Sequence, residues 1–165
     1  MRCLVVYFSN GNNTRIVGNE IARQMRADIC EIRPIVAYPK DYQKLMTKGI
    51  TDVKKGNKPE IEDITIDFSK YDTIFIGTPN WLDTYAPPVA TFLEKYYLEN
   101  KIIVPFLTHN KGGKGHVAED IREAYPKCRV IEAISIYGDG GETLVRDVER
   151  EIARKNVHNL NLIVK

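Results

Sequence analysis

The chain has 165 residues, of which 43% are hydrophobic and 28% are charged, a composition typical of a globular protein with one core of ordinary size. We therefore expect a single domain over residues 1–165. The formal net charge is only +2 and the lysines are scattered, which argues against a nucleic-acid partner, because such partners require a basic stripe or patch.

The N-terminal segment MRCLVVYFSN lacks the apolar core and the small-residue cleavage site of a secretory signal, and no apolar run is long enough to span a membrane. Three cysteines, Cys3, Cys30 and Cys128, lie far apart among apolar residues. This placement is typical of reduced, buried thiols rather than of disulfides or a zinc site. We therefore expect a cytoplasmic protein without a membrane partner.

Short apolar segments alternate with segments of helical periodicity. Strands are expected at residues 4–8, 28–34, 73–77, 102–107 and 130–136. Several of these are almost continuously apolar, as in strands buried on both faces, whereas Pro34 and its charged neighbours favour an edge position for the second strand. Apolar residues recur at helical spacing within residues 17–25, 42–53, 89–96 and 144–152. This alternation predicts a three-layer α/β/α sandwich around a parallel sheet.

One connection is longer than the others. Residues 35–71 separate the second and third strands and include a helix with Asp41 as the expected N-cap and Gly56 as the expected C-cap. The segment TIDF that follows has apolar side chains to bury. We interpret this connection as an elaborated crossover rather than as a linker between domains.

Ligands of open parallel sheets bind outside the carboxyl ends of the strands, where the strand order reverses. Three loops in such positions have an unusual composition. They are SNGNNT (9–14), TPNWLDTYAPP (78–88) and THNKGGKGH (108–116). We therefore examine these three loops as the candidate site.

The loop 9–14 has the composition of a neutral phosphate cradle. A helix N-terminus presents unpaired N–H groups and partial positive charge, so it binds phosphate without a basic side chain. Hydroxyl and amide side chains add donors, and Gly11 allows a positive φ or a close approach. The loop is neither a Walker loop nor GxGxxG. An ordinary N-cap turn is the alternative interpretation.

The other two loops suggest contacts to a flat ligand. Trp81 is the only tryptophan and follows a buried strand, so it is a candidate aromatic platform, with a partly buried surface aromatic as the alternative. Gly112, Gly113 and Gly115 allow close wrapping around a ligand, although a flexible surface turn has the same composition. His109 and His116 lack neighbouring cysteines or carboxylates, and we predict no metal site.

The order YFSNGNNT, YDTIFIGTPNW and THN followed by a glycine-rich turn resembles the flavodoxin family in its short-chain form, over nearly the whole chain. The resemblance implies a five-stranded parallel sheet in the order 2-1-3-4-5, which makes the three loops neighbours. It also implies FMN as the cofactor. The implied cofactor-binding residues are Ser9, Asn10, Gly11, Asn12, Asn13 and Thr14 for the phosphate, Thr78, Pro79, Asn80, Trp81, Leu82, Asp83 and Thr84 beside the isoalloxazine, and Thr108, His109, Asn110, Lys111, Gly112 and Gly113 at the pyrimidine edge.

The chain departs from the family pattern in three respects. Gly11 stands at a hydroxyl position and Asn12 at the glycine, so Asn12 is expected to tolerate a left-handed backbone. Asp83 stands where a glycine follows the tryptophan by two residues, and the resemblance implies that its charge lowers the reduction potential of the flavin. The net charge is also slightly basic, whereas carrier flavodoxins are typically acidic.

No combination of nucleophile, base and orienting residue is evident, so we predict no catalytic side chains. The resemblance implies an FMN protein that transfers electrons between redox partner proteins. The alternative is an FMN-dependent NAD(P)H:quinone-type reductase with a small electron acceptor. A third interpretation is a non-catalytic binding module of the same fold that has lost FMN.

Overall fold

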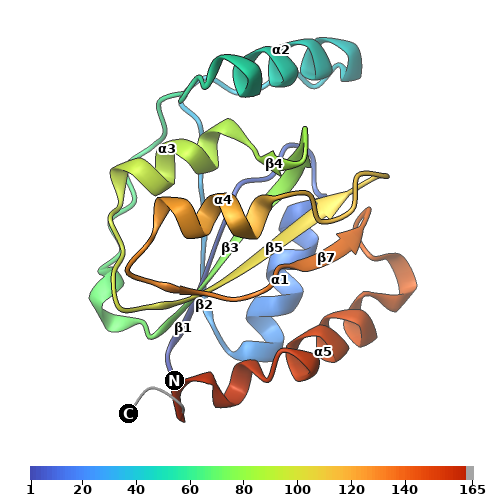
Figure 1. Cartoon of the computed structure of the whole chain (residues 1–165). Coiled ribbons are helices and arrows are strands. Elements are labelled where there is room, and N and C mark those ends of the chain that lie inside the picture. Colours follow the sequence, from blue (N-terminus) through green and yellow to red (C-terminus); the bar gives the residue numbers. More distant parts are fainter. Residues whose placement is uncertain (163–165) are drawn as a thin grey trace.

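The computed structural model describes residues 1–162. A sheet lies between two layers of helices, and a further helix lies at the top of the molecule (Figure 1). The strands are β1 (Cys3–Tyr7), β2 (Asp28–Glu31), β3 (Thr73–Trp81), β4 (Thr84–Tyr85), β5 (Ile102–His109), β6 (Arg129–Val130) and β7 (Ile134–Tyr137). The α-helices are α1 (Asn13–Met25), α2 (Tyr42–Lys55), α3 (Pro87–Lys95), α4 (Val117–Ala124) and α5 (Leu144–Arg154). Short 3₁₀ helices cover Phe68–Lys70, Gly141–Thr143 and Val157–Leu162.

The central strands are buried on both faces, as their continuous apolar sequence predicts. In β1, Val5 packs with side chains of α1 and α5, whereas Val6 packs with side chains of α3 and α4. Both side chains are fully buried. The sheet thus separates two apolar cores, and the three-layer sandwich is confirmed.

The strand order is β2-β1-β3-β5-β6, with β7 also paired to β5. All of these pairs are parallel. If β6 and β7 are taken together as the fifth strand, this is the expected order 2-1-3-4-5, and it is confirmed. Among the strands of residues 1–162, only the short β4 is antiparallel to its neighbour, β3. The carboxyl ends of β1, β3 and β5 therefore lie side by side.

The expected continuous strand over residues 130–136 is wrong, because it is divided into β6 and β7. Between them, the exposed Glu132 forms ion pairs with Lys114, with Arg154 at 3.7 Å and with Lys155 at 3.5 Å. The second strand is also shorter than expected. Beyond its end, Pro34 forms an isolated antiparallel bridge with Ile61, since proline cannot donate to a regular ladder.

The third strand is longer than expected. It continues through Trp81 and folds back as a hairpin with β4, so the interpretation of residues 78–88 as a loop is wrong in its first half. The long connection 35–71 is a crossover, as expected. Asp41 accepts a hydrogen bond from the Lys44 N–H at 2.9 Å, and Gly56 ends α2 with φ 64°. Ile64, Ile66 and Phe68 pack against the core.

The ring of Phe106 fills a narrow space between α1 and β3. A Cβ atom added to Gly77 would lie 2.0 Å from Cζ of Phe106, and one added to Gly18 would lie 3.3 Å from the same atom. Phe106 itself is fully buried. Both glycines therefore let α1 approach the sheet closely, which fixes the position of the helix N-terminus at the carboxyl end of β1.

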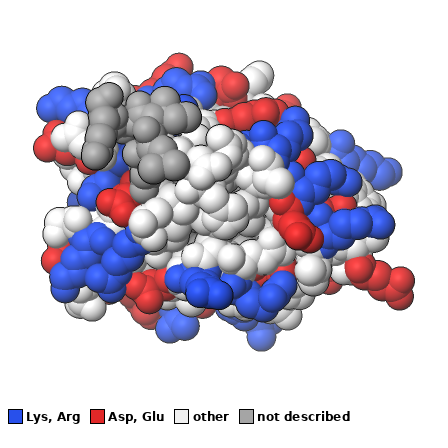
Figure 2. Space-filling model, turned by 90° about the horizontal axis from the view of Figure 1, so that it is seen from below, with Lys and Arg blue, Asp and Glu red and all other residues white. Residues whose placement is uncertain are grey.

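The end of the molecule that carries the N-terminus lies opposite these carboxyl ends (Figure 1). On this face, basic and acidic side chains are interspersed around an uncharged central area (Figure 2).

All three cysteines are free thiols, but only Cys3 is fully buried, and Cys30 and Cys128 are half-buried. No helix in residues 1–162 is long and apolar enough to cross a membrane.

Candidate functional site

The loop between β1 and α1 presents an open row of backbone N–H groups. Within the described chain, no backbone N–H from Asn10 to Thr14 donates to another group. The N-cap residue Asn12 makes no side-chain cap bond, and the first turn of α1 has no acidic residue. Unpaired donors at a helix N-terminus attract an anion through both hydrogen bonding and the helix dipole.

The turn of this loop is made by Gly11, for which a positive φ was one of the two expected roles. Gly11 has φ +85°, and a Cβ there would meet no atom within 4 Å, so the loop is open on that side. Asn12 has φ −126°, so the expectation of a left-handed Asn12 is wrong. The positive φ falls on the glycine because only glycine adopts it without steric cost. Ser9 closes the turn by accepting from the Arg15 N–H at 3.3 Å.

Arg15, which sequence reasoning missed, draws the Asn12 side chain away from the helix cap. Its guanidinium donates to Oδ1 of Asn12 at 3.1 Å and to Oε1 of Glu31 at 2.6 Å. Because Oδ1 of Asn12 is engaged by Arg15, it does not cap the N–H groups of α1. The signal in the sequence that could have identified Arg15 is its position directly after Thr14 at the start of the predicted helix.

The end of β3 forms a tight hairpin with β4. Asn80 pairs with Tyr85 and Trp81 with Thr84, which leaves Leu82 and Asp83 as the two loop residues. Their φ angles are 53° and 65°, as in a type I′ turn. Such turns favour Asn-Gly, so two ordinary side chains here are held by other contacts.

The glycine-rich loop after β5 supplies those contacts. The Asn80 side chain donates to the Gly113 carbonyl at 2.9 Å, and the His116 N–H donates to the Asp83 carbonyl at 2.6 Å. At Gly115, with φ +53°, a Cβ would lie 2.3 Å from the Asp83 oxygen. The two loops are therefore joined backbone to backbone, and only glycine fits at position 115.

Trp81 lies within an aromatic cluster beneath α2. Its ring centroid is 5.8 Å from that of Phe8 and 5.1 Å from that of Tyr38, both in edge-to-face geometry. A Cβ on Gly49 would come within 3.2 Å of the indole. Trp81 is thus half-buried and rigidly held, with α2 packed against it. Its role as a stacking partner for a ligand stays a prediction.

The cluster is anchored by a buried carboxylate on α2. Asp52 is 5% exposed and accepts from the Tyr38 hydroxyl at 2.9 Å, from Lys48 at 3.0 Å and from the Asn57 side chain at 2.9 Å. Burial raises the pKa of Asp52, but these hydrogen bonds outweigh it and lower the pKa overall. Burial, followed by the bond to Asp52, raises the pKa of Tyr38. The pair is thus a carboxylate and a neutral phenol at neutral pH.

The remaining candidate residues occupy different surroundings. Thr78 is buried and accepts from the Ala86 N–H at 2.9 Å, and Pro79 pairs with Thr108 across the sheet. Asn110, Lys111 and Gly112 are exposed in the glycine-rich loop.

His109 and Tyr137 lie opposite each other in β5 and β7, with ring centroids 5.9 Å apart. The buried Nδ1 of His109 has no partner in the described chain. Thr14 and Thr108, from different loops, form a buried hydrogen bond of 2.8 Å.

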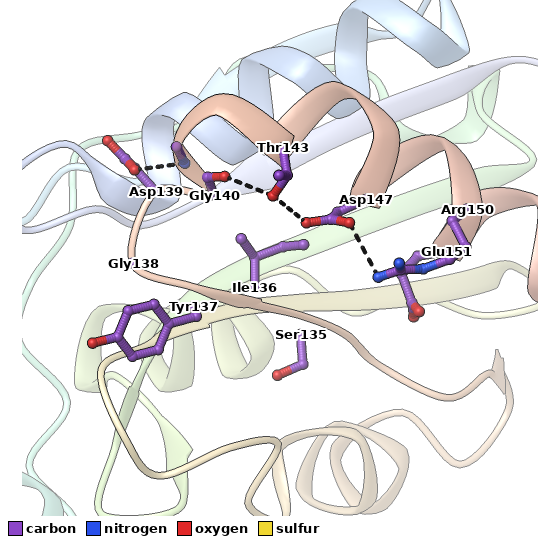
Figure 3. Close-up of a pocket in the computed structure, with 11 residues that line it drawn as sticks. Ser135, Ile136, Tyr137, Gly138, Asp139, Gly140, Thr143, Asp147, Arg150 and Glu151 are labelled. Atoms are coloured by element: carbon purple, nitrogen blue, oxygen red, sulfur yellow. Dashed lines mark hydrogen bonds and ion pairs between the residues drawn. The ribbon is translucent and has the colours of Figure 1, made fainter.

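Two hollows lie near these loops. A small apolar pocket of about 80 Å³ lies between α2 and the hairpin, lined by Leu45, Met46, Gly49, Ile50, Asn80, Trp81 and Leu82. A larger hollow of about 390 Å³ lies between the end of β7 and α5 and contains none of the predicted site residues. Its polar side chains bind one another, with Asp147 accepting from Thr143 at 2.6 Å and pairing with Arg150 at 3.2 Å (Figure 3).

The structure thus brings the three sequence-selected loops to one end of a parallel sheet in flavodoxin order, which defines a protein of the flavodoxin type. A family model described as flavodoxin matches residues 2–150. The chain belongs to the flavodoxin family. A search of curated proteins finds no match.

Solved structures share the fold. A candidate flavoprotein from Bacteroides eggerthii has a TM-score of 0.81 at 23% identity, covering 94% of this chain and 98% of that one. A flavoprotein from Lactobacillus acidophilus, solved in complex with FMN, has a TM-score of 0.68 at 22% identity and covers 94% and 98%. Oxidised flavodoxin 2 from Bacillus cereus has a TM-score of 0.62 at 14% identity and covers 96% and 99%.

Proposed function

We propose that this protein binds FMN and transfers electrons between redox partner proteins in the cytoplasm. The observation that carries the proposal is the row of unpartnered backbone N–H groups from Asn10 to Thr14 at the start of α1. A phosphate monoester supplies acceptors for these donors, and the helix dipole favours its negative charge. The Lactobacillus acidophilus neighbour, solved with FMN, supports the same cofactor.

The residues around the neighbouring strand ends fit a flat ring system. The hairpin tip and the glycine-rich loop are fixed to each other by the Asn80–Gly113 and Asp83–His116 hydrogen bonds. Preformed walls of this kind reduce the ordering cost of binding. When bound, the flavin supplies the electron chemistry, so the protein's part is to hold the ring, exclude water and set its potential.

A second candidate function is that of an FMN-dependent reductase for a quinone or another small acceptor, with a nicotinamide donor. The apolar pocket between α2 and the hairpin favours it, because Asn80, Trp81 and Leu82 line the pocket and are also among the residues expected beside the isoalloxazine. Steady-state turnover of NADH or NADPH with a soluble quinone distinguishes this function from that of a carrier, which requires a protein partner to turn over.

The first test is titration of the flavin-stripped protein with FMN, followed by the fluorescence of Trp81, the only tryptophan. We expect saturable quenching by FMN, with much weaker binding of riboflavin, which has the same ring but no phosphate. Equal binding of the two ligands would contradict the phosphate assignment of residues 9–14. No binding of either ligand would leave the third interpretation, a binding module that has lost FMN.

A further inference from the structure

A buried pair of threonine hydroxyls connects the phosphate loop to the end of β5. Oγ1 of Thr14, in the first turn of α1, lies 2.8 Å from Oγ1 of Thr108, and either atom can be the donor. Thr14 is 1% exposed and Thr108 is 3% exposed. Because 94 residues separate them in the chain, the contact depends on the tertiary fold.

The two threonine hydroxyls carry two protons, but the hydrogen bond between them needs only one. Each hydroxyl has one O–H donor, and the only hydrogen bond that either side chain makes within residues 1–162 is the one between them. One proton therefore has no acceptor. A buried donor without an acceptor is costly, and the N–H groups beside Thr14 are unpartnered as well. An anion at the start of α1 would accept hydrogen bonds from both the spare hydroxyl proton and these N–H groups.

The position of Thr108 in β5 is one where an apolar side chain would serve packing better than a threonine. Ile102, Val104 and Phe106 alternate along β5 toward the core under α1 and α5, and Thr108 continues this row by the period of two. An apolar residue would extend the core without a spare donor. The row instead turns polar at the residue that meets the first turn of α1, where its hydroxyl contacts Thr14.

We propose that Thr108 is a positioning residue for phosphate recognition. Its hydroxyl donates to Oγ1 of Thr14, and the Thr14 proton is thereby directed to an oxygen of the FMN phosphate. This inference rests on the proposed function, in which residues 9–14 hold that phosphate. It assigns to Thr108 a role different from the pyrimidine-edge contact that the family resemblance implies.

The test compares FMN with riboflavin, because only FMN has a phosphate. For Thr108→Val we expect the affinity for FMN to fall about 5- to 10-fold, as for loss of one hydrogen bond between neutral groups, while riboflavin affinity changes less than about 2-fold. Thr108→Ser, which keeps the hydroxyl, restores FMN binding. Thr73→Val is the matched control. Thr73 is also a buried threonine, but it lies at the start of β3, at the opposite end of the sheet from Thr108. We expect Thr73→Val to leave the ratio of the FMN and riboflavin affinities unchanged.

The double variant tests whether Thr108 acts through Thr14. In a Thr14→Val background, Thr108→Val is expected to have no further effect on FMN affinity. The same additional loss with or without Thr14 would overturn the inference, and so would an equal loss of FMN and riboflavin affinity, which would place Thr108 against the ring. Failure of the unmodified protein to prefer FMN over riboflavin would instead overturn the proposed function.

Discussion

Substitution of Gly77 by alanine tests the packing that positions α1. The added Cβ would lie 2.0 Å from Cζ and 2.5 Å from two further ring carbons of Phe106, whereas carbon atoms normally pack at about 3.5–4.0 Å. The ring must therefore move by about 1.5 Å. Phe106 is 0% exposed, so no solvent-filled space receives it.

The expected magnitude follows from two opposing effects. Gly77 does not have a positive φ, so alanine would by itself stabilise the strand by about 0.5–1 kcal/mol. Overpacking of a full core costs about 1–3 kcal/mol, and a contact this short corresponds to the upper end. We expect Gly77→Ala to lower the free energy of unfolding by about 2 kcal/mol, which moves the urea midpoint by about 1 M for a slope of about 2 kcal/mol/M.

The assay is equilibrium urea unfolding of the flavin-free protein, followed by circular dichroism. Phe106→Leu replaces the ring that causes the clash by a shorter side chain. The double variant Gly77→Ala/Phe106→Leu is therefore expected to be more stable than the sum of the two single effects predicts, by about 1 kcal/mol or more. A Gly77→Ala protein as stable as the parent, or strict additivity with Phe106→Leu, would refute the reasoning.

Three further changes probe the site. The pKa of Asp52 is lowered in the folded state, so this carboxylate stabilises the fold above its unfolded pKa of about 4 and stabilises it less as the pH falls below that value. Asp52→Asn should lower the free energy of unfolding by about 1–2 kcal/mol at pH 7 and flatten its pH dependence between pH 5 and 2. An unchanged slope would contradict this. Asp83→Gly is expected to raise the midpoint potential of bound FMN in a potentiometric titration, an idea that an unaltered potential would eliminate. Gly115→Ala forces Cβ against the Asp83 carbonyl, so it should weaken FMN and riboflavin equally in fluorescence titrations, unlike a change in the phosphate loop.

The elements whose signals are local were predictable. Alternating apolar runs and helical periods predict the three-layer sandwich, whereas the strand order came from the family resemblance. The caps Asp41 and Gly56 are visible as single residues at the ends of a periodic segment. The three loops follow from the topology, because the carboxyl ends of adjacent parallel strands share one edge.

The features that depend on contacts between distant segments were not predictable. The hairpin at Leu82 and Asp83 lacks the Asn-Gly signal of a type I′ turn, and it is held by the glycine-rich loop. The burial of Trp81 depends on where α2 packs after a long connection, which no periodicity reveals. The hydroxyl pair of Thr14 and Thr108 likewise exists only once α1 lies against β5.

The interruption between β6 and β7 has a consequence for how copies of the molecule meet in solution. A long, regular outer strand with free N–H and C=O groups is a template for the edge of another sheet. Here the outer strand is divided into two short pieces, and the charged Glu132 stands between them with its lysine and arginine partners. An incoming strand would have to break these ion pairs and follow an irregular backbone. The sheet is therefore protected against edge-to-edge aggregation on this side, so intermolecular β-structure is not expected to form through this edge even at high concentration.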